Sequence, residues 1–257
     1  MTSFARPLAI GCMRLSTEAD RDDARALATL HAALDAGVTL LDTADAYALD
    51  EEDAGHNERL LARALATWSG DVGTVRVATK GGLTRPAGRW VADGRARQLA
   101  AACAASRRAL GVERIHLYQL HAPDPKTSLA TSVRALATLR RDGLIEHIGL
   151  CNVSLAQLEE ALRLADIAAV QVEISPWHED SLRNGVAERC VAEGLLLLAH
   201  RPLGGIARAA SLARDPAIAA VAPRAMASWR HSRRTTNHRR PMPGVILVSR
   251  TSDQAAG

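Results

Sequence analysis

The sequence predicts an α/β fold, a (β/α)8 TIM barrel, and three observations lead to that prediction. Six apolar stretches each run directly into a polar or ionisable residue. Helical patterns separate these stretches, which is the layout of a parallel β/α repeat. The chain has 257 residues, and this length fits one barrel of roughly 250 residues better than two independent domains. We therefore expect a single domain over residues 1–257.

The expected strands follow one another along the chain with helices between them. The six stretches are residues 38–41 before Asp42, 75–79 before Lys80, 115–120 before His121, 145–150 before Cys151 and Asn152, 169–172 before Glu173, and 195–199 before His200. Shorter apolar segments at residues 8–13 and 245–249 are expected to be the first and last strands. Helices are expected at residues 20–36, 57–68, 95–110, 128–141, 154–165 and 180–192.

Helix ends carry their own signals. Gly111, Gly143 and Gly194 each follow a helical pattern, and glycine adopts the left-handed conformation that ends a helix. Ser154 and Gln157 form a capping-box pattern at the start of the fifth helix. These signals support the expected boundaries.

Composition excludes several classes of protein. A hydrophobic content of 47% and a charged content of 23% are ordinary for a globular domain. The aromatic content of 3% argues against a surface that stacks bases, and the formal charge of +4 arises from arginines between Asp215 and Asp253 rather than from a basic stripe. We expect no nucleic acid partner.

The cysteines and the apolar runs predict the cellular compartment of the protein. The four cysteines show no metal-ligand spacing, which suits reduced thiols and a cytoplasmic protein, and no metal site is expected from them. No run approaches the roughly 18 apolar residues of a membrane span, so we expect no membrane association.

Four reactive side chains are expected to converge, because strands of such a barrel present reacting groups at their carboxyl ends. They are Asp42, Tyr47, Lys80 and His121. Carbonyl reduction needs a hydride donor and a proton donor for the developing alkoxide. A tyrosine is a poor acid at neutral pH unless a cation stabilises its phenolate, and a lysine held by an aspartate can supply that cation. A nearby histidine can orient the substrate oxygen.

Each of these residues alone has a plainer interpretation. Asp42 fits an ordinary loop acid, Tyr47 a rim aromatic, Lys80 a solvated turn residue before two glycines, and His121 a hydrogen-bonded core histidine. All four occur in this order, each at a strand end, and this favours a proton-transfer site.

The segments around these residues resemble the motifs of the aldo-keto reductase family. LLDTADAY resembles the family's Asp-to-Tyr motif, VRVATKGG its lysine strand and IHLYQLHAPDP its histidine strand. IGLCNVS resembles the segment that usually reads Ser-Asn, with Cys151 in place of the serine, and VQVEISPW carries the family's glutamine as Gln171. LLLLAHRPLGG resembles the segment under the nicotinamide, so the resemblance extends over residues 8–205.

The resemblance implies an NADPH-dependent oxidoreductase that reduces an aldehyde or ketone to an alcohol. Tyr47 would donate the proton, Asp42 and Lys80 would activate it, and His121 would orient the carbonyl. The absence of a GxGxxG motif is consistent with a family that binds NADP without a Rossmann domain. The implied NADP(H) site consists of Met13, Asp42, Asn152, Gln171, His200, Arg201, Leu203, Gly204, Ser249 and Arg250.

Within that cofactor site the resemblance assigns some roles. Asn152 and Gln171 would hold the nicotinamide carboxamide, and His200 occupies the place of a tyrosine that stacks on the ring in many members. Trp90 and Trp177 fall in loops after the third and sixth of the eight expected strands, residues 75–79 and 169–172, where a pocket wall would lie.

Residues 222–257 depart from the family pattern. The family normally follows its eighth strand with a basic, hydroxyl-containing motif for the adenosine 2′-phosphate and then a final helix. Here Ser249, Arg250 and Thr251 fit a remnant phosphate site and a solvated tail equally well. We expect the last helix to be missing, NADPH affinity and selectivity to be weakened, and the uncovered strand to favour self-association.

Two functions other than that of a reductase remain open. One is a regulatory barrel that binds NADP and turns over little, and the other is a barrel lyase that uses Lys80 as a Schiff-base amine. The expected partner of the reductase is a small-molecule carbonyl substrate.

Overall fold

Eight parallel strands form one sheet in the residues that the computed structural model describes, 9–205 and 245–247. The strand order follows the chain, and the last strand, β10, also contacts the first, β1, so the sheet comes round on itself. This confirms the predicted (β/α)8 barrel. The strands are β1 (Ala9–Gly11), β2 (Leu40–Asp42), β3 (Arg76–Gly81), β6 (Ile115–Leu120), β7 (Ile145–Cys151), β8 (Ile167–Glu173), β9 (Leu196–His200) and β10 (Val245–Leu247).

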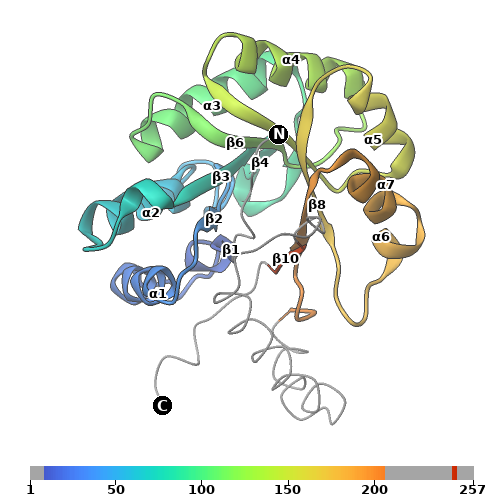
Figure 1. Cartoon of the computed structure of the whole chain (residues 1–257). Helices are drawn as coiled ribbons and strands as arrows, with labels where there is room; N and C mark the ends of the chain where they lie inside the picture. The colour runs from blue at the N-terminus through green and yellow to red at the C-terminus, as the bar shows by residue number, and fades with distance from the viewer. Residues whose placement is uncertain (1–8, 206–244, 248–257) are drawn as a thin grey trace.

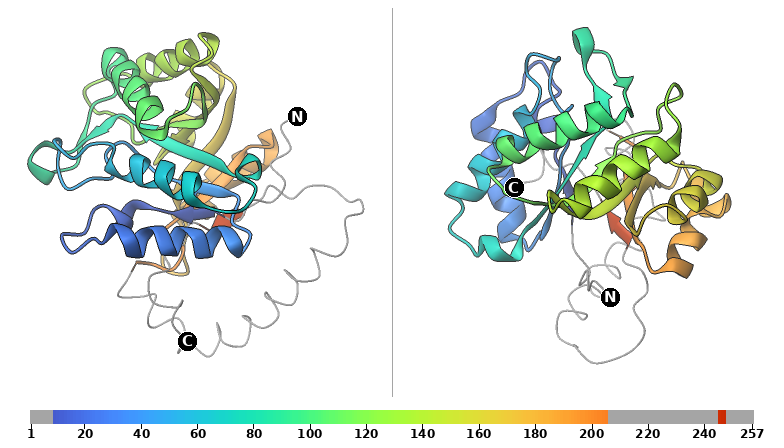
Figure 2. Two further views of the ribbon diagram at one scale, coloured as in Figure 1. Left: turned by 90° about the vertical axis from the view of Figure 1, so that its left-hand side faces the viewer. Right: turned by 90° about the horizontal axis from the view of Figure 1, so that it is seen from above.

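Helices cover the outside of the sheet and pack against their neighbours in chain order (Figure 1). Figure 2 shows α1 and α2 side by side on one flank of the barrel, with α3 and α4 next to them. The helices are α1 (Asp23–Asp35), α2 (His56–Thr67), α3 (Ala96–Leu110), α4 (Leu129–Arg141), α5 (Leu155–Leu162), α6 (Asp180–Arg183) and α7 (Val186–Glu193).

The predicted helix ends are largely confirmed. Ser154 accepts a hydrogen bond from the backbone N–H of Gln157, and the Gln157 side chain accepts one in return, which completes the capping box of α5. Gly111 and Gly194 end α3 and α7 in the left-handed conformation, and Gly143 follows α4 with a φ of 74°.

Two layers of apolar side chains hold the barrel together. The larger layer lies between the helices and the sheet, and the smaller one fills the barrel interior. Because side chains alternate along a strand, the residue two positions further on faces the same way. On several strands, the residue two positions after an apolar interior residue is polar. A layer of polar side chains therefore lies next to the apolar layer inside the barrel. The interior layer is Ala9, Leu40, Ala78, Leu117, Ala169, Leu196 and Leu198.

The structure differs from the sequence-based expectation in two places. The helix expected over residues 180–192 is interrupted, because Asn184 ends α6 and Gly185 adopts a φ of 87° before α7 begins. A short antiparallel hairpin of β4 (Leu83–Thr84) and β5 (Val91–Ala92), not foreseen from the sequence, follows β3.

The expectations for the missing last helix and for most of residues 222–257 lie outside the described residues. Extension of a single domain over residues 1–257 stays a prediction.

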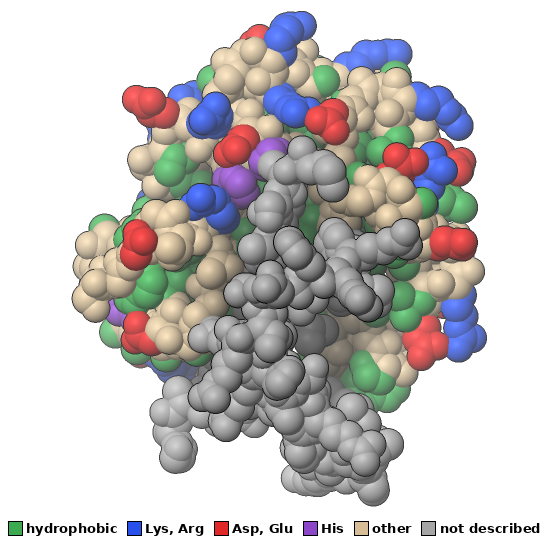
Figure 3. Space-filling model, in the orientation of Figure 1, with side chains coloured by type: hydrophobic (Ala, Val, Ile, Leu, Met, Phe, Trp, Pro, Cys, Tyr) green, Lys and Arg blue, Asp and Glu red, His purple; other side chains and the backbone are tan. Residues whose placement is uncertain are grey.

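The described surface carries charges of both signs. Figure 3 shows acidic and basic side chains interspersed over the described part of one face. Among the helices that the structure describes, none combines the length and the apolar character needed to cross a membrane.

Candidate active site

The side chains singled out from the sequence converge at the carboxyl ends of the strands. Asp42 is the last residue of β2, Lys80 is next to last in β3, and His121 directly follows β6. Tyr47 lies in the loop after β2, in a segment whose backbone hydrogen-bonds to β3 at Ala78 and Lys80. The barrel therefore brings together residues that are up to 79 positions apart in the sequence.

Lys80 is at the centre of this group. Its Nζ lies 2.9 Å from Asp42 Oδ2, 2.8 Å from the carbonyl oxygen of Thr43 and 3.0 Å from the Tyr47 hydroxyl. The lysine is fully buried, and so is almost all of Asp42. The ion pair and the contact with Tyr47 rule out the plainer interpretation of Lys80 as a solvated turn residue.

The rings of His121 and Trp90 lie edge-on against the Tyr47 ring. The rings of Tyr47 and His121 are 5.5 Å apart and nearly perpendicular, at 77°. The ring of Trp90, which directly precedes β5 of the hairpin, lies 6.3 Å from the Tyr47 ring and 6.2 Å from the His121 ring. The Arg85 guanidinium lies 4.1 Å above the Trp90 ring. Trp90 is 45% exposed, so it borders the site as a wall that solvent reaches.

Burial and charge set the protonation states of the site. Burial raises the pKa of Tyr47 to about 12, although Lys80 opposes the rise. Burial lowers the pKa of Lys80, but Asp42 and Tyr47 outweigh it, so that pKa is raised above its ordinary value. Burial, together with the Lys80 charge, holds the pKa of His121 well below its ordinary value. At neutral pH the site therefore contains a phenol, an ammonium ion and a neutral imidazole.

Asp42 is held by amides as well as by Lys80. Gln171 Nε2 donates to Asp42 Oδ1 at 3.0 Å, and Gln119 Nε2 approaches the same oxygen at 3.4 Å. Cys151 Sγ lies within hydrogen-bond distance of the side-chain oxygens of both glutamines, at 3.6 and 3.7 Å, and its single proton can be donated to either. Gln119 was not singled out from the sequence, yet a signal was present: it is a polar residue inside an apolar strand, two positions before His121 and on the same side.

Asn152 and His200 form a second pair at the barrel mouth. Asn152 adopts a left-handed φ of 57°, and its Nδ2 donates to the His121 carbonyl oxygen at 3.0 Å. His200 Nε2 lies 3.1 Å from Asn152 Oδ1. Burial lowers the pKa of His200 to about 4, so the ring is neutral at physiological pH. Through these two contacts, Asn152, which directly follows β7, connects the ends of β7, β6 and β9.

The other residues of the expected cofactor site lie where strands end. Met13 is in the turn after β1 and is 39% exposed, and Leu203 and Gly204 are in the loop after β9. Arg201 adopts a φ of 51° and its Nη1 lies 3.6 Å from Glu173 Oε2. Ser249 and Arg250 lie outside the described residues.

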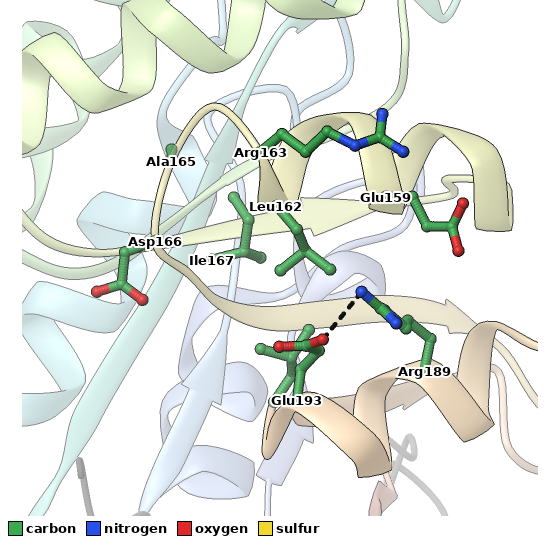
Figure 4. A pocket seen from close by; sticks show the side chains of 9 residues that line it. Glu159, Leu162, Arg163, Ala165, Asp166, Ile167, Arg189 and Glu193 are labelled. Atoms are coloured by element: carbon green, nitrogen blue, oxygen red, sulfur yellow. Dashed lines mark ion pairs between the residues drawn. The ribbon is translucent and has the colours of Figure 1, made fainter.

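A separate pocket of about 420 Å³ lies at the opposite end of the barrel (Figure 4). Its walls come from α5, α7 and the residues at or just before the starts of β8 and β9, such as Ile167 and Leu195. Figure 4 shows the ion pair between Arg189 and Glu193 at its edge. None of the side chains that converge around Lys80 lines this pocket.

The sequence and fold match known proteins. The Aldo/keto reductase family model matches residues 7–237. A 6-dehydroglucose reductase of Novosphingobium aromaticivorans is 36% identical over 218 residues, covering 83% of this chain and 70% of that protein. A solved glycerol dehydrogenase of Gluconobacter oxydans is 30% identical with a TM-score of 0.66, over 75% of this chain and 58% of that one.

A solved aldo-keto reductase of Bacillus halodurans, in its holo form, is 25% identical with a TM-score of 0.63, over 75% of this chain and 60% of that one. The chain thus spans less than two thirds of the length of these two solved relatives. The family match, by contrast, covers most of the present chain. The chain therefore belongs to the aldo/keto reductase family of oxidoreductases.

Proposed function

We propose that this chain reduces an aldehyde or ketone with NADPH, and that Tyr47 donates the proton. The observation that carries the proposal is the contact of the Tyr47 hydroxyl with Lys80, which Asp42 in turn holds in a buried ion pair. A buried cation beside a phenol lowers the cost of forming the phenolate when the proton leaves.

The residues at the barrel mouth fit a nicotinamide cofactor. The Nδ1 atom of His121 is buried without a hydrogen-bond partner among the described residues, so a polar group is needed on that side of the site. Asn152 is exposed and its amide has hydrogen-bonding capacity beyond its two present partners. Asn152 and His200 would hold the nicotinamide, and Met13, Arg201, Leu203 and Gly204 the remainder of the cofactor.

Gln171 is engaged differently in this structure. It is almost completely buried, and its amide donates to Asp42. Its expected contact with the carboxamide stays a prediction, as do the roles of Ser249 and Arg250. When bound, NADPH supplies the hydride.

The chain's own groups then govern the proton. Tyr47, with its pKa raised to about 12 by burial, stays protonated at neutral pH. A phenol of this strength still protonates an alkoxide, because the alkoxide is the stronger base. Lys80 stabilises the phenolate that results, and the neutral His121 ring can donate a hydrogen bond to the substrate oxygen.

The lyase alternative is less well supported. A Schiff-base lysine must lose its proton to act as a nucleophile. Lys80 is fully buried, donates to three oxygen atoms and has its pKa raised above the ordinary value by Asp42 and Tyr47, despite the opposing effect of burial. The arrangement favours a permanent cation over a nucleophilic amine.

The names of the relatives suggest where to look for a substrate. A 6-dehydroglucose reductase and a glycerol dehydrogenase act, by their names, on polyhydroxylated compounds. We propose a small, polyhydroxylated carbonyl compound as substrate, in the cytoplasm.

The test combines cofactor binding with turnover. NADPH and NADH are titrated separately by fluorescence, and their oxidation is then followed with a panel of sugar-derived aldehydes and ketones and of simple aldehydes. The proposal predicts saturable NADPH binding and turnover of at least one carbonyl. Binding without turnover of any compound would favour the regulatory barrel, and borohydride trapping of a substrate on the protein would favour the lyase.

A further inference from the structure

Three side chains with metal-ligand chemistry meet near the amino-terminal ends of β6 and β7. His116 Nδ1 lies 3.0 Å from Glu146 Oε2, and His147 Nε2 lies 3.4 Å from Glu146 Oε1. The two imidazole rings are 5.0 Å apart and perpendicular, at 88°. One ligand atom from each residue can be chosen so that all three lie within 4.8 Å of one another.

The strand register brings His116 and Glu146 level with each other, and His147 is the next residue of β7. Ile115 pairs with Ile145 and Leu117 pairs with His147, so β6 and β7 begin level with each other. His116 and Glu146 occupy matching positions between those pairs. His147 is only 8% exposed and the His116 side chain 18%, whereas the Glu146 side chain is 43% exposed, so both imidazoles are largely buried while the carboxylate borders solvent.

The distances suit a metal ion. Zinc binds imidazole nitrogen and carboxylate oxygen at roughly 2.0–2.2 Å, which places the ligand atoms of a tetrahedral site roughly 3.3–3.6 Å apart. The observed separations of 3.0 and 3.4 Å join the two imidazoles to different oxygens of the Glu146 carboxylate. With one ligand atom taken from each residue, all three atoms lie within 4.8 Å of one another, which is wider than the ideal spacing. A metal can therefore bind between these groups after small side-chain rotations.

We propose that His116, Glu146 and His147 bind one divalent transition metal ion, Zn²⁺ in the first place, with water as the fourth ligand. Two imidazoles and one carboxylate favour Zn²⁺ over Ca²⁺ or Mg²⁺, which prefer oxygen ligands.

The role of this ion is structural. His121 and Asn152 lie at the opposite ends of the same two strands. Active sites of such barrels lie at the carboxyl-terminal face, so an ion at the amino-terminal end links β6 to β7 without touching substrate.

Nearby positively charged side chains limit the affinity of the cluster for a metal ion. The charge of Arg114 acts on Glu146, and that of Arg140 acts on His147. Arg140 Nη1 is itself held at 2.8 Å by Asp166, which offsets part of its charge. We expect a dissociation constant in the micromolar range rather than a nanomolar one.

The test uses the untagged full chain, stripped with a chelator and titrated with Co²⁺ and then Zn²⁺ alone. Co²⁺ should give the visible absorption of a tetrahedral site at one equivalent, without a thiolate charge-transfer band, and Zn²⁺ should displace it. Zn²⁺ at about 100 times its dissociation constant should raise the melting temperature by roughly 5–10 °C.

Substitutions of the three side chains test whether each of them binds the metal ion. His116→Ala, His147→Ala and the nearly isosteric Glu146→Gln should each weaken Co²⁺ binding at least about tenfold. Two controls should bind as the wild type does: His178→Ala, and the double variant His231→Ala with His238→Ala. Absence of one-to-one binding by the wild type, unchanged affinity in Glu146→Gln, or loss of binding in either control would overturn the proposal.

Discussion

At the scale of single residues, the site depends on one buried lysine. Lys80 donates to Asp42, to Tyr47 and to the backbone of Thr43, and all of its side chain is excluded from water. A charge in this position is tolerated only because its partners surround it. The same contacts that stabilise the lysine also place its charge beside the phenol.

Replacing Lys80 tests this dependence. Lys80→Met leaves the Asp42 carboxylate buried without its cation, and losing one member of a buried pair costs about 3–5 kcal/mol. We expect a matching fall in the free energy of unfolding, measured with denaturant, and loss of carbonyl reduction in whatever protein stays folded. Lys126→Met is the control, because Lys126 is exposed and is the other lysine of the chain. Equal stability of the two variants would contradict the assignment.

The pH dependence of the reaction rate follows from two groups whose pKa values are shifted. Burial raises the pKa of Tyr47 to about 12, and burial with Lys80 holds the pKa of His121 well below its ordinary value. Reduction needs the phenol and the neutral imidazole, and both persist between about pH 6.5 and pH 9. The kcat for reduction should be flat over that range, whereas alcohol oxidation, which needs the phenolate, should rise with pH. A reduction rate that falls with a midpoint inside the range would contradict these protonation states.

At the scale of elements, the pairing of β3 with β6 brings Lys80 and His121 together. Gly81 leaves room for the Tyr118 side chain of β6, because a Cβ built there would lie 2.0 Å from the Tyr118 hydroxyl and 2.9 Å from Tyr118 Cζ. Tyr118 is completely buried on β6, so it has little room to move.

Gly81→Ala should therefore destabilise the fold. Overpacking a core typically costs about 1–3 kcal/mol, measured as a shift in the denaturant midpoint. Adding Tyr118→Phe removes the oxygen that meets the new methyl group and should restore part of that loss. If Gly81→Ala unfolds at the wild-type midpoint, β3 and β6 are not packed in this way.

Sequence patterns predicted most of these elements. The strands that end in Asp42, Lys80 and His121 were recognisable because each apolar run ends abruptly in an ionisable residue. The break between α6 and α7 was missed although Asn184 and Gly185 form a turn signal, since the apolar spacing continues across it. The β4–β5 hairpin was missed because two-residue strands carry no periodicity.

The convergence of these side chains was predictable from the sequence, but their interactions were less so. Ionisable residues at strand ends are visible in a sequence, whereas the hydrogen bond from Gln171 to Asp42 joins side chains 129 positions apart. The stacking of Arg85 on Trp90 likewise depends on how the hairpin folds back over the barrel mouth. The rise in the pKa of Tyr47 depends on burial, which no motif encodes.

At the scale of the whole molecule, the two ends of the barrel carry different groups of side chains. The carboxyl ends of the strands present the Lys80 group, whereas the amino-terminal ends carry the His116, Glu146 and His147 cluster and the pocket between α5 and α7. An apolar interior layer lies between the two ends, so changes at one end are expected to leave the other unaltered. We propose that this architecture makes Tyr47 the proton donor.

The most direct measurement compares the two tyrosines of the chain under identical conditions. Tyr47→Phe should lower kcat for carbonyl reduction by roughly 100- to 10,000-fold while leaving NADPH affinity nearly intact, since general acid catalysis contributes about that much. Tyr118→Phe, which removes only a 3.4 Å hydrogen bond to Leu99, should keep nearly wild-type turnover. Wild-type turnover in Tyr47→Phe, with NADPH still bound, would contradict the role of Tyr47 as proton donor.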